Sequence, residues 1–293
     1  MPSCAFLTTD GLEGFVTDDE LVLGPLRERG VEVTLVPWRS RAEWGRFDVV
    51  VIRTTWDYQA APDEFLEALE TIEGSGARLA NDLELVRWNL SKTYLRDLRS
   101  RGVTIVPTHF GVGLRADDLR RRFDELGAGE LVVKPVIGAN AGDAYRLTRE
   151  GLASRTPELE AVFRDRGFLV QPFIPSVVDE GEFSLVFFGG RHSHTILKTP
   201  KPGDFRVQEE HGSTVLAVHA DAALLAAARR CLGALDRPPL QARVDLVRLA
   251  DGGFAVMELE LIEPALYLRM DPEAPARFVA AFGAWLSGHS SPA

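Results

Sequence analysis

Apolar and polar residues follow two different periods in the first part of the chain, residues 1–80. Four short apolar runs are typical of β-strands: Cys4–Thr8, Val31–Val36, Phe47–Ile52 and Ala77–Ala80. The third run is uninterrupted, as expected of a strand that is covered on both faces. Between the runs, Thr17–Glu20 has the pattern of a capping box that opens a helix towards Gly30, and Pro62 suits the first turn of another helix. Alternating strands and helices predict a parallel, doubly wound sheet, an α/β domain over residues 1–80.

Residues 81–175 carry a second set of signals. Asn81 and Asp82 are favourable helix caps, and the helix that follows is expected to run to Arg101, with Lys92 inside it. The other expected elements are strands over Val103–Pro107, Leu131–Pro135 and Phe168–Pro175 and helices over Asp117–Leu126 and from Thr156. Prolines at the end of the last strand remove N–H donors and fix the backbone, as suits a segment that joins two lobes. We expect residues 81–175 to form a small lobe with a linking helix.

The third part of the chain, residues 176–293, has the pattern of a larger lobe. Two hairpins and two helices are expected there: Glu182–Phe188 with His192–Lys198, Val244–Leu249 with Phe254–Leu261, and helices over Ala220–Leu235 and Ala274–Leu286. Gly189-Gly190 and Asp251-Gly252-Gly253 supply the two hairpin turns. The fold class expected for the whole chain is α/β, with a doubly wound parallel sheet followed by two α+β lobes.

Three carboxylates on the second hairpin are the first candidates for chemistry. Strand periodicity puts Glu258 and Glu260 on one face, and the hairpin brings them near Asp245 on the partner strand. Carboxylates at such distances repel one another unless a cation lies between them, and oxygen ligands suit Mg²⁺, above all Mg²⁺ that already carries phosphates. The alternative is a solvated acidic strand face, because surface carboxylates are common.

Composition limits the function further. The chain has 293 residues, 45% apolar and 26% charged, as in an ordinary globular protein. No apolar run is long enough for a membrane span, and residues 1–10 lack the features of a signal peptide, so we expect a cytoplasmic protein without a membrane partner. The net charge of −10 disfavours a nucleic-acid partner and favours a small molecule. Cys4 and Cys231 form neither a metal pattern nor a disulfide framework and are expected to be buried thiols.

Lysine is rare in this chain. Of 33 basic residues only four are lysines: Lys92, Lys134, Lys198 and Lys201. Because arginine serves nearly everywhere else, a retained lysine is a candidate for a compact charge against phosphate. Lys134 ends a predicted strand, and Gly138 and Gly142 in the loop that follows allow backbone N–H groups to approach a phosphate. The same pattern is also that of an ordinary hairpin with a Gly-rich turn.

A polar loop, Arg53–Tyr58, follows the buried strand of the first domain. In parallel α/β sheets ligands bind beyond the carboxyl ends of the strands, where this loop is expected to lie. Arg53, Thr54, Trp56 and Asp57 offer a guanidinium, a hydroxyl, an aromatic ring and a carboxylate, which together suit a small zwitterionic substrate. The alternative is that the aromatic side chains Trp56 and Tyr58 pack under the next helix.

In this order, the motifs resemble the ATP-grasp superfamily and, within it, the glutathione-synthetase-like carboxylate–amine ligases. The resemblance spans nearly the whole chain and implies an N-terminal doubly wound domain followed by a two-lobed ATP-grasp module. The motifs that carry it are Lys92, Lys134-Pro135 before the glycine loop, the interlobe hinge Gln171–Ile174, Glu182, Asp204-Phe205-Arg206 ahead of Gly212, and Arg243-x-Asp245 with Glu258-x-Glu260.

The resemblance also implies roles for these residues, with ATP and two Mg²⁺ ions bound between the lobes. ATP contacts are implied for Lys92, Lys134, Gly138, Gly142, Gln171, Pro172, Phe173, Ile174 and Glu182. Asp245, Glu258 and Glu260 are implied as metal ligands, with Glu258 as the bridge. Lys198 would face a phosphate, and Arg206 and Arg243 would steady the transferred phosphoryl group or the tetrahedral intermediate.

The implied reaction joins a small-molecule carboxylate to an amine. The carboxylate attacks the γ-phosphorus of ATP to give an acyl phosphate and ADP, and the amine then displaces phosphate. Arg53–Tyr58 and Glu258-Leu259-Glu260 look most like the small ligases related to the cyclo-ligase of cycloserine biosynthesis, which implies ring closure within one molecule. Two alternatives stay open: an ATP-grasp enzyme that cross-links side chains of a ribosomal peptide, and a non-catalytic ATP-binding module. A homodimer is compatible with all three.

Three positions depart from the family's pattern. Glu260 stands where relatives usually have Asn and adds a formal negative charge to the metal site. Gln208 likewise stands where relatives often have Asn, and the loop after Lys134 has fewer glycines than usual. These departures concern the geometry of the site more than the class of enzyme.

Overall fold

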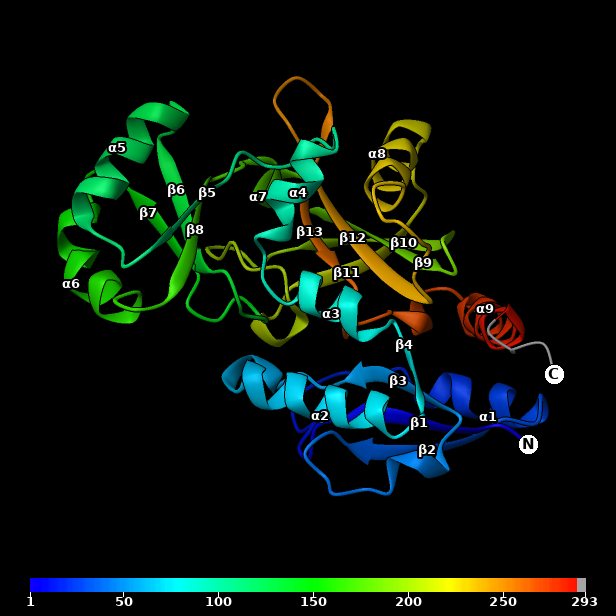
Figure 1. Cartoon of the computed structure of the whole chain (residues 1–293). Helices are drawn as coiled ribbons and strands as arrows, with labels where there is room; N and C mark the ends of the chain where they lie inside the picture. Colours follow the sequence, from blue (N-terminus) through cyan, green and yellow to red (C-terminus); the bar gives the residue numbers. More distant parts are fainter. Residues whose placement is uncertain (289–293) are drawn as a thin grey trace.

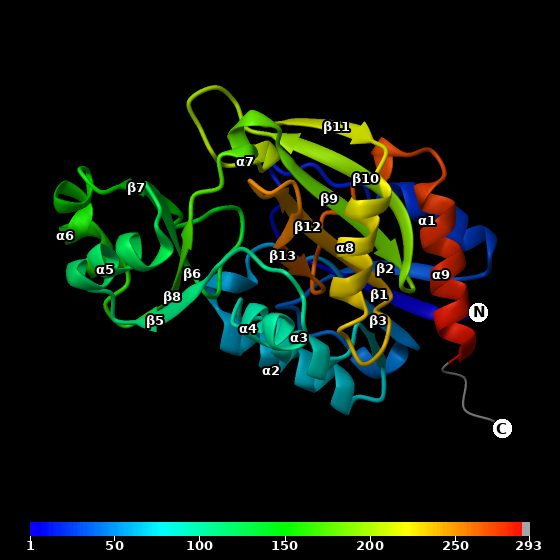
Figure 2. The same cartoon turned by 90° about the horizontal axis from the view of Figure 1, so that it is seen from above.

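The computed structural model describes residues 1–288, and its strands form three sheets (Figures 1 and 2). The first is a four-stranded parallel sheet in the order β2-β1-β3-β4. Its strands are β1 (Ser3–Thr8), β2 (Glu32–Pro37), β3 (Val49–Thr54) and β4 (Arg78–Ala80), and its helices are α1 (Glu20–Glu28) and α2 (Pro62–Gly74).

Helices cover both faces of this first sheet. Phe6 and Val51 point to the face that α1 and the C-terminal helix α9 (Ala274–Gly288) cover, whereas Leu7 and Ile52 point to the face under α2. Every residue of β3 is therefore buried, as its unbroken apolar run predicts. The doubly wound parallel sheet is confirmed.

The capping box predicted at the start of α1 is wrong. Asp19 occupies the N-cap position, but its side chain makes no capping hydrogen bond. Asp19 instead pairs with Arg53 and Asp18 pairs with Arg269, so both carboxylates are used in contacts with distant parts of the chain.

The second sheet is antiparallel, in the order β5-β8-β6-β7, with two helices packed against it. Its elements are β5 (His109–Val112), α5 (Ala116–Leu126), β6 (Glu130–Pro135), β7 (Tyr145–Thr148), α6 (Leu152–Val162) and β8 (Gly167–Pro172). Phe123 and Phe163 fill its core. The helix expected from Thr156 begins earlier, at Leu152, so Pro157 lies inside it.

The single helix expected from Asp82 to Arg101 is wrong, although Asp82 does cap it by accepting a hydrogen bond from Leu85 N (3.0 Å). The chain forms α3 (Leu83–Asn89) and α4 (Tyr94–Ser100), and Lys92 lies in the break. Long-range contacts explain the break. The Asn89 amide bonds with Leu259 O and Leu261 N along β13, and Lys92 N donates to Val136 O at 2.7 Å.

The third sheet is antiparallel, in the order β11-β10-β9-β12-β13. Its elements are β9 (Glu182–Phe188), β10 (Arg191–Thr199), β11 (Thr214–Val218), α8 (Ala222–Leu232), β12 (Gln241–Arg248) and β13 (Phe254–Glu260). Both predicted hairpins are present. Gly189 and Gly190 have φ values of 56° and 75°, the left-handed pair that a tight hairpin turn requires.

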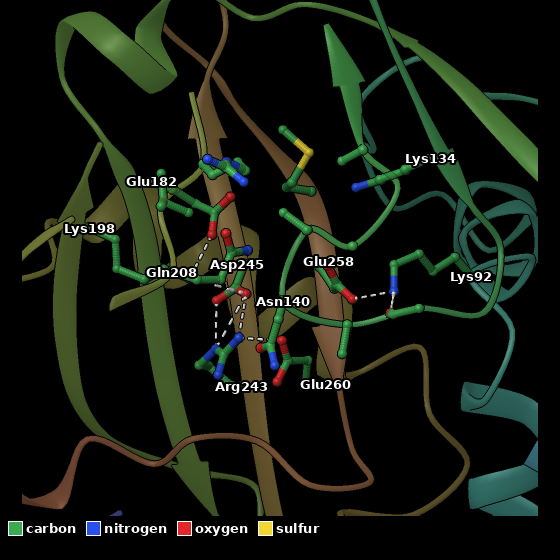
Figure 3. Close-up of a pocket in the computed structure, with 18 of the residues that line it drawn as sticks. Lys92, Lys134, Asn140, Glu182, Lys198, Gln208, Arg243, Asp245, Glu258 and Glu260 are labelled. Carbon is green, nitrogen blue, oxygen red and sulfur yellow. Dashed lines mark hydrogen bonds and ion pairs between the residues drawn. The ribbon is translucent and has the colours of Figure 1, made fainter. Parts of the chain in front are cut away.

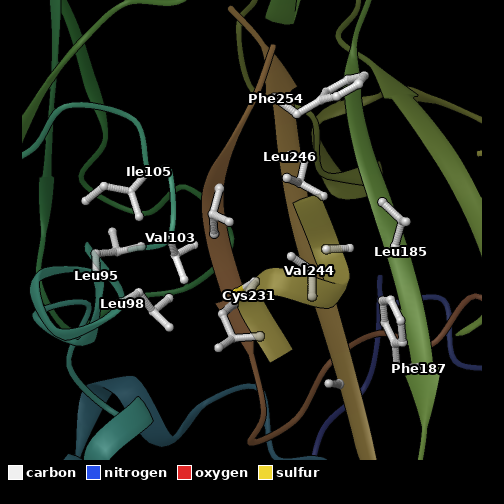
Figure 4. Packing of buried hydrophobic residues seen from close by; sticks show 14 of the residues in the cluster. Leu95, Leu98, Val103, Ile105, Leu185, Phe187, Cys231, Val244, Leu246 and Phe254 are labelled. Atoms are coloured by element: carbon white, nitrogen blue, oxygen red, sulfur yellow. The ribbon is translucent and has the colours of Figure 1, made fainter. Parts of the chain in front are cut away.

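The two linking helices pack differently: α3 buries Leu83 and Val86 in the core of the first sheet, and α4 packs mainly on the third sheet. Leu95 and Leu98 of α4, with Val103 and Ile105, lie against the sheet face beside α8 (Figure 4). The strand expected over Val103–Pro107 is reduced to one bridge, between Ile105 and Val256. One further short helix is α7 (Ser176–Asp179), and 3₁₀ turns cover Trp44–Arg46, Tyr58–Ala60, Glu209–His211 and Leu268–Met270.

A β-bulge shapes the hairpin of β12 and β13. Asp245 pairs with Glu258 while Leu246 pairs with Val256, so Met257 is the extra residue. The bulge explains why the buried positions of β13 change from Val256 to Leu259, three residues apart. Among residues 1–288, no helix has the length and apolar character needed to cross a membrane.

Candidate active site

A cavity lies where elements of the three sheets meet. The first sheet contributes the loop after β3, the second the ends of β6 and β8, and the third one face of β9, β10, β12 and β13. All the residues predicted to bind ATP or metal line it, together with the three residues predicted to be catalytic. Figure 3 shows the carboxylates of the sheet face between Lys198 on one side and Lys92 and Lys134 on the other.

Two register pairs carry the acidic centre of the cavity. Asp245 lies opposite Glu258, and Arg243 lies opposite Glu260. The Arg243 guanidinium donates to both oxygens of Asp245, with Nε–Oδ1 and Nη2–Oδ2 distances of 2.9 Å, and also pairs with Glu260. Ser184 Oγ adds a 2.5 Å hydrogen bond to Asp245 Oδ1. The predicted face of the hairpin is therefore present.

The charges on this face shift the acid pKa values in opposite directions. Burial would raise the pKa of Asp245, but Arg243 and Lys198 hold it well below its usual range. Burial would likewise raise the pKa of Glu258, and the ammonium groups of Lys92 and Lys134 lower it instead. Burial raises the pKa of Glu260 to about 8, because repulsion from Asp245 and Glu258 acts against the attraction of Arg243. Of these three acids, Glu260 is therefore the one that the cations of the protein hold least firmly in its charged form.

Lys198 and Glu182 form a buried pair on adjacent strands. Lys198 Nζ lies 2.7 Å from Glu182 Oε1 and 3.5 Å from Asp245 Oδ2. Burial would lower the pKa of Lys198, but these two carboxylates raise it above its usual range. Lys198 therefore stays charged and connects Glu182 on β9 with Asp245 on β12.

Lys92 and Lys134 lie on the opposite side and differ in their partners. Lys92 Nζ lies 2.8 Å from Glu258 Oε1 and donates to Gly138 O at 2.7 Å. Within residues 1–288 the Lys134 ammonium makes no hydrogen bond or ion pair with protein atoms, and burial lowers its pKa. A buried ammonium that faces a cavity without a partner suits an anionic ligand.

The loop after Lys134 connects β6 to β7, so it is a hairpin connection that also lines the cavity. A Cβ at Gly138 would lie 2.8 Å from Pro135 Cγ, so this glycine is required for the close turn. Asn140, Ala141 and Asp143 have left-handed φ values between 52° and 54°, which glycine would adopt with less strain. The Asn140 carbonyl accepts a 2.9 Å hydrogen bond from His211 across the cavity.

The hinge Gln171–Ile174 forms one wall. Gln171 Nε2 donates to Thr108 Oγ1 at 2.9 Å, and Phe173 N donates to Glu130 O at 2.9 Å. Phe173 also packs edge-on against Phe205, with ring centroids 6.5 Å apart. This wall offers an apolar surface beside backbone polar groups, as a purine ring requires.

Two ion pairs hold the loop that carries Arg206, and the second of them continues to the first domain. Its guanidinium pairs with Asp204, with an Nη2–Oδ2 distance of 2.7 Å. Glu209, three residues on, accepts both of its bonds from Arg269 Nη2 at 2.6 and 2.7 Å. Arg269 in turn binds Asp18 of the first domain at 2.9 Å.

The four residues predicted to contact the substrate have different positions. Trp56 lines the cavity, whereas Arg53, Thr54 and Asp57 are not part of its wall. Arg53 is 2% exposed and donates to Asp19 Oδ1 and to Gln241 Oε1 at 2.7 and 2.8 Å. Thr54 bonds to the hydroxyl of Thr8, and Asp57 accepts from Trp38 Nε1. Arg53, Thr54 and Asp57 thus bond to protein groups outside the cavity wall, and their contact with substrate stays a prediction.

Glu263 is a cavity residue that the sequence analysis did not select. It is 9% exposed and lies against the loop after β3, where its carbonyl accepts a 2.9 Å hydrogen bond from Trp56 Nε1. Tyr58 also lines the cavity, and its hydroxyl lowers the pKa of the Glu263 carboxyl group. The sequence did offer a signal for Glu263: it is a further acid, three residues after Glu260 and directly before Pro264.

The carboxylates suit magnesium that arrives with phosphate. Among residues 1–288 no three His, Cys, Asp or Glu side chains surround a common point, so the protein has no complete cage for a metal ion. Mg²⁺ is usually held by one or two carboxylates with substrate phosphates and water, so a complete cage is not required. Asp245, Glu258 and Glu260 supply hard oxygen donors, and a divalent cation beside Glu260 would favour the charged form of that carboxylate.

The fold matches that of ATP-grasp enzymes. A D-alanine–D-alanine ligase from Bacillus anthracis, solved in complex with ATP, superposes with a TM-score of 0.68 at 15% identity, covering 98% of each chain. The ATP-grasp ligase PsnB, solved with a minimal precursor, Mg and ADP, superposes with a TM-score of 0.63 at 15% identity, covering 96% of this chain and 97% of PsnB. The chain thus has the fold of the ATP-grasp ligases.

Sequence similarity defines the family more closely. A family profile described as D-cycloserine synthetase DcsG, N-terminal domain, matches residues 4–81. The cycloserine biosynthesis protein DcsG of Streptomyces lavendulae is 35% identical over 276 residues, which cover 89% of this chain and 91% of the relative. The crystal structure of D-cycloserine synthetase DcsG superposes with a TM-score of 0.89 at 31% identity, covering 97% of this chain and 99% of that chain. The chain belongs to the DcsG family of ATP-grasp ligases, which are ATP-dependent enzymes.

Proposed function

We propose that this enzyme joins a carboxylate to an amine of a small amino-acid-like substrate through an acyl phosphate, with release of ADP and phosphate. We further propose that both groups belong to one molecule, so that the product is a ring. Ring closure is suggested by the description of a relative of this chain as a D-cycloserine synthetase.

One observation carries this proposal. The cavity face presents Asp245, Glu258 and Glu260 beside Lys92 and Lys134, within one continuous wall. Alternating carboxylates and ammonium groups suit a triphosphate with its magnesium, because the lysines attract the phosphate oxygens and the acids attract the metal. Magnesium, when bound, would withdraw charge from the phosphoryl oxygens and orient the γ-phosphate.

The chain's own groups then have separate tasks in the proposal. Lys134 and Lys92 bind phosphate oxygens, the hinge wall receives the adenine, and Glu182 accepts bonds from the ribose hydroxyls. Arg206 and Arg243 stabilise the charge that develops during phosphoryl transfer and during attack of the amine. The loop that bears Gly138 covers the phosphates and excludes water, which would otherwise hydrolyse the acyl phosphate.

The similarity to DcsG favours a small-molecule substrate over a ribosomal peptide. PsnB, which was solved with a precursor peptide, shares the fold at 15% identity, whereas DcsG is 35% identical over nearly all of its length. The non-catalytic alternative conflicts with the enzyme family to which the chain belongs.

The direct test measures ADP release with ATP, Mg²⁺ and a panel of amino acids, dipeptides and ureido compounds, followed by mass spectrometry of the product. Ring closure gives a product that contains atoms of one acceptor molecule only, whereas intermolecular ligation gives a condensed pair. The ligase proposal fails if ATP binds but no member of the panel stimulates ADP release.

A further inference from the structure

The acids that line the cavity differ in their partners. Four of them have cationic partners on neighbouring elements: Glu182 with Lys198, Asp245 with Arg243, Glu258 with Lys92, and Glu260 with Arg243. Glu209 pairs with Arg269, and Glu210 is exposed to solvent. Within residues 1–288, Glu263 is the one buried acid of the cavity wall that no lysine, arginine or histidine approaches within 4.0 Å.

All the groups that bond to the Glu263 carboxylate are neutral. Gln59 Nε2 donates to Oε1 at 3.3 Å, and the Tyr58 hydroxyl lies close enough to lower the pKa of the carboxyl group. Burial raises the pKa of Glu263 to about 7, because the Tyr58 hydroxyl and the Lys92 ammonium, which lies beyond ion-pair distance, offset only part of the burial. A buried carboxylate in this position costs desolvation free energy unless a positively charged ligand binds beside it.

The surroundings favour an ammonium group over a second metal ion. Trp56 and Tyr58 both line the cavity beside Glu263, and aromatic faces attract alkylammonium ions. The Glu263 carboxylate bonds to the loop after β3, and no three acids of the described chain converge on a metal position. A primary ammonium needs only one carboxylate and neighbouring aromatic or hydroxyl groups.

We propose that Glu263, oriented by Tyr58 and Gln59, binds the protonated amino group of the substrate and selects amino acids over carboxylic acids that lack this group. This inference rests on the proposed ligase function and deepens it. The inference assigns recognition of the substrate's positive charge to Glu263, in the loop after β13. From the sequence alone we expected substrate contacts from Arg53, Thr54, Trp56 and Asp57, in the loop after β3.

The test compares pairs of ureido acids that differ only in the α-amino group, a ureido amino acid with its des-amino counterpart, because both members of such a pair keep the nitrogen that ring closure requires. ADP release is measured with the full chain, ATP and Mg²⁺ for the wild type and for Glu263→Gln, which keeps the side chain's size but removes its charge. Glu210→Gln is the matched control, because it removes one negative charge from the exposed rim of the same cavity.

We expect the wild type and the control to prefer the amino member by about 30-fold in kcat/KM, as one charged hydrogen bond allows. In Glu263→Gln the preference falls to about threefold or less, while KM for ATP stays unchanged. Tyr58→Phe keeps the carboxylate but removes its hydroxyl donor, so it gives a smaller loss of preference and tests the site if Glu263→Gln does not fold.

Three results overturn the inference and leave the ligase function intact. The first is an unchanged amino preference in Glu263→Gln, and the second is a wild type that uses both members of a pair equally well. The third is a shift in the Mg²⁺ requirement of Glu263→Gln without a change in preference, which would make Glu263 a metal ligand. If no acid stimulates ADP release by the wild type, the proposed function itself has failed.

Discussion

The two ends of the cavity are built in different ways. At the end that we assign to ATP and magnesium, the side chains stand on adjacent strands, so that Asp245 meets Glu258 and Arg243 meets Glu260 by register alone. At the other end, Trp56 and Glu263 meet between two loops that are 207 residues apart in the chain. The acidic centre of the first end is a property of one hairpin, whereas the second end exists only when the first domain packs on the third sheet. Substitutions at the two ends should therefore have different consequences.

The largest expected effect is at the strand-built end. Glu258→Gln should lower kcat by about 10³-fold or more, because it removes a proposed metal ligand and the partner of Lys92. The melting temperature should change little, since Glu258 is partly exposed to the cavity and is not packed in the core. Steady-state ADP release and thermal melting measure the two quantities.

Glu180→Gln is the control for this prediction. Glu180 pairs with Arg248 of the same hairpin, at 3.0 Å and away from the cavity. Its loss should leave turnover within about twofold of the wild type, as is usual for exposed ion pairs. Wild-type turnover in Glu258→Gln would remove the metal assignment.

The next effect concerns Arg53 and separates structure from substrate binding. Arg53→Met leaves Asp19 buried without its cation, and breaking a buried pair costs about 3 kcal/mol or more. In a chain of this size we expect a fall in melting temperature of roughly 6–10 °C, with KM for every substrate unchanged. Arg27→Met, at an exposed position of α1, should not lower the melting temperature. A raised substrate KM with normal melting would restore Arg53 as a substrate residue.

These contacts explain how far the sequence could predict the fold and the site. The β12–β13 hairpin was predictable because period two puts its acids on one face, and even the bulge at Met257 leaves a trace in the spacing of Val256 and Leu259. The partners of Arg53 were not predictable, because Asp19 and Gln241 lie 34 and 188 residues away. A guanidinium at a strand end suits a ligand or a domain contact equally well, and only the packing of the domains decides between them.

The break between α3 and α4 has the same origin. The helix ends at Asn89, whose side-chain amide bonds with the backbone of Leu259 in β13 and of Leu261 just after it. The rarity of lysine drew attention to Lys92, which lines the cavity, yet Lys92 was placed inside a helix and lies in a turn. Residue type selected the side chain, and long-range contacts determined the local structure around it.

Lys134 should show an intermediate effect, limited to the nucleotide. Lys134→Met removes the buried ammonium that has no protein partner, and we expect KM for ATP to rise by about 10- to 30-fold, as for a lost charge-assisted bond to phosphate. KM for the amino-acid substrate should stay the same. Lys201→Met, an exposed lysine outside the cavity wall, is the matched control. Equal effects on both KM values would show that the two ends of the cavity are not independent.

The smallest expected effect is at Arg269, which connects the two ends. Its guanidinium binds Asp18 of the first domain and Glu209 of the loop that carries Arg206, so it can fix this loop only when the domains are docked. The Arg269 side chain is 30% exposed, and ion pairs with this exposure contribute about 1 kcal/mol at most. Arg269→Gln should therefore lower kcat by about threefold and leave KM for ATP unchanged, because the hinge and the lysines keep their positions.

A loss confined to kcat distinguishes a positioning residue from one that only stabilises the fold. Arg269→Lys keeps the charge and should recover part of kcat, whereas a role in stability alone would lower the melting temperature and leave kcat of the folded enzyme intact. Arg237→Gln is the matched control, because Arg237 forms a similar exposed pair with Asp82 that does not line the cavity. If Arg269→Gln and Arg237→Gln behave alike, the loop that bears Arg206 does not depend on contact with the first domain.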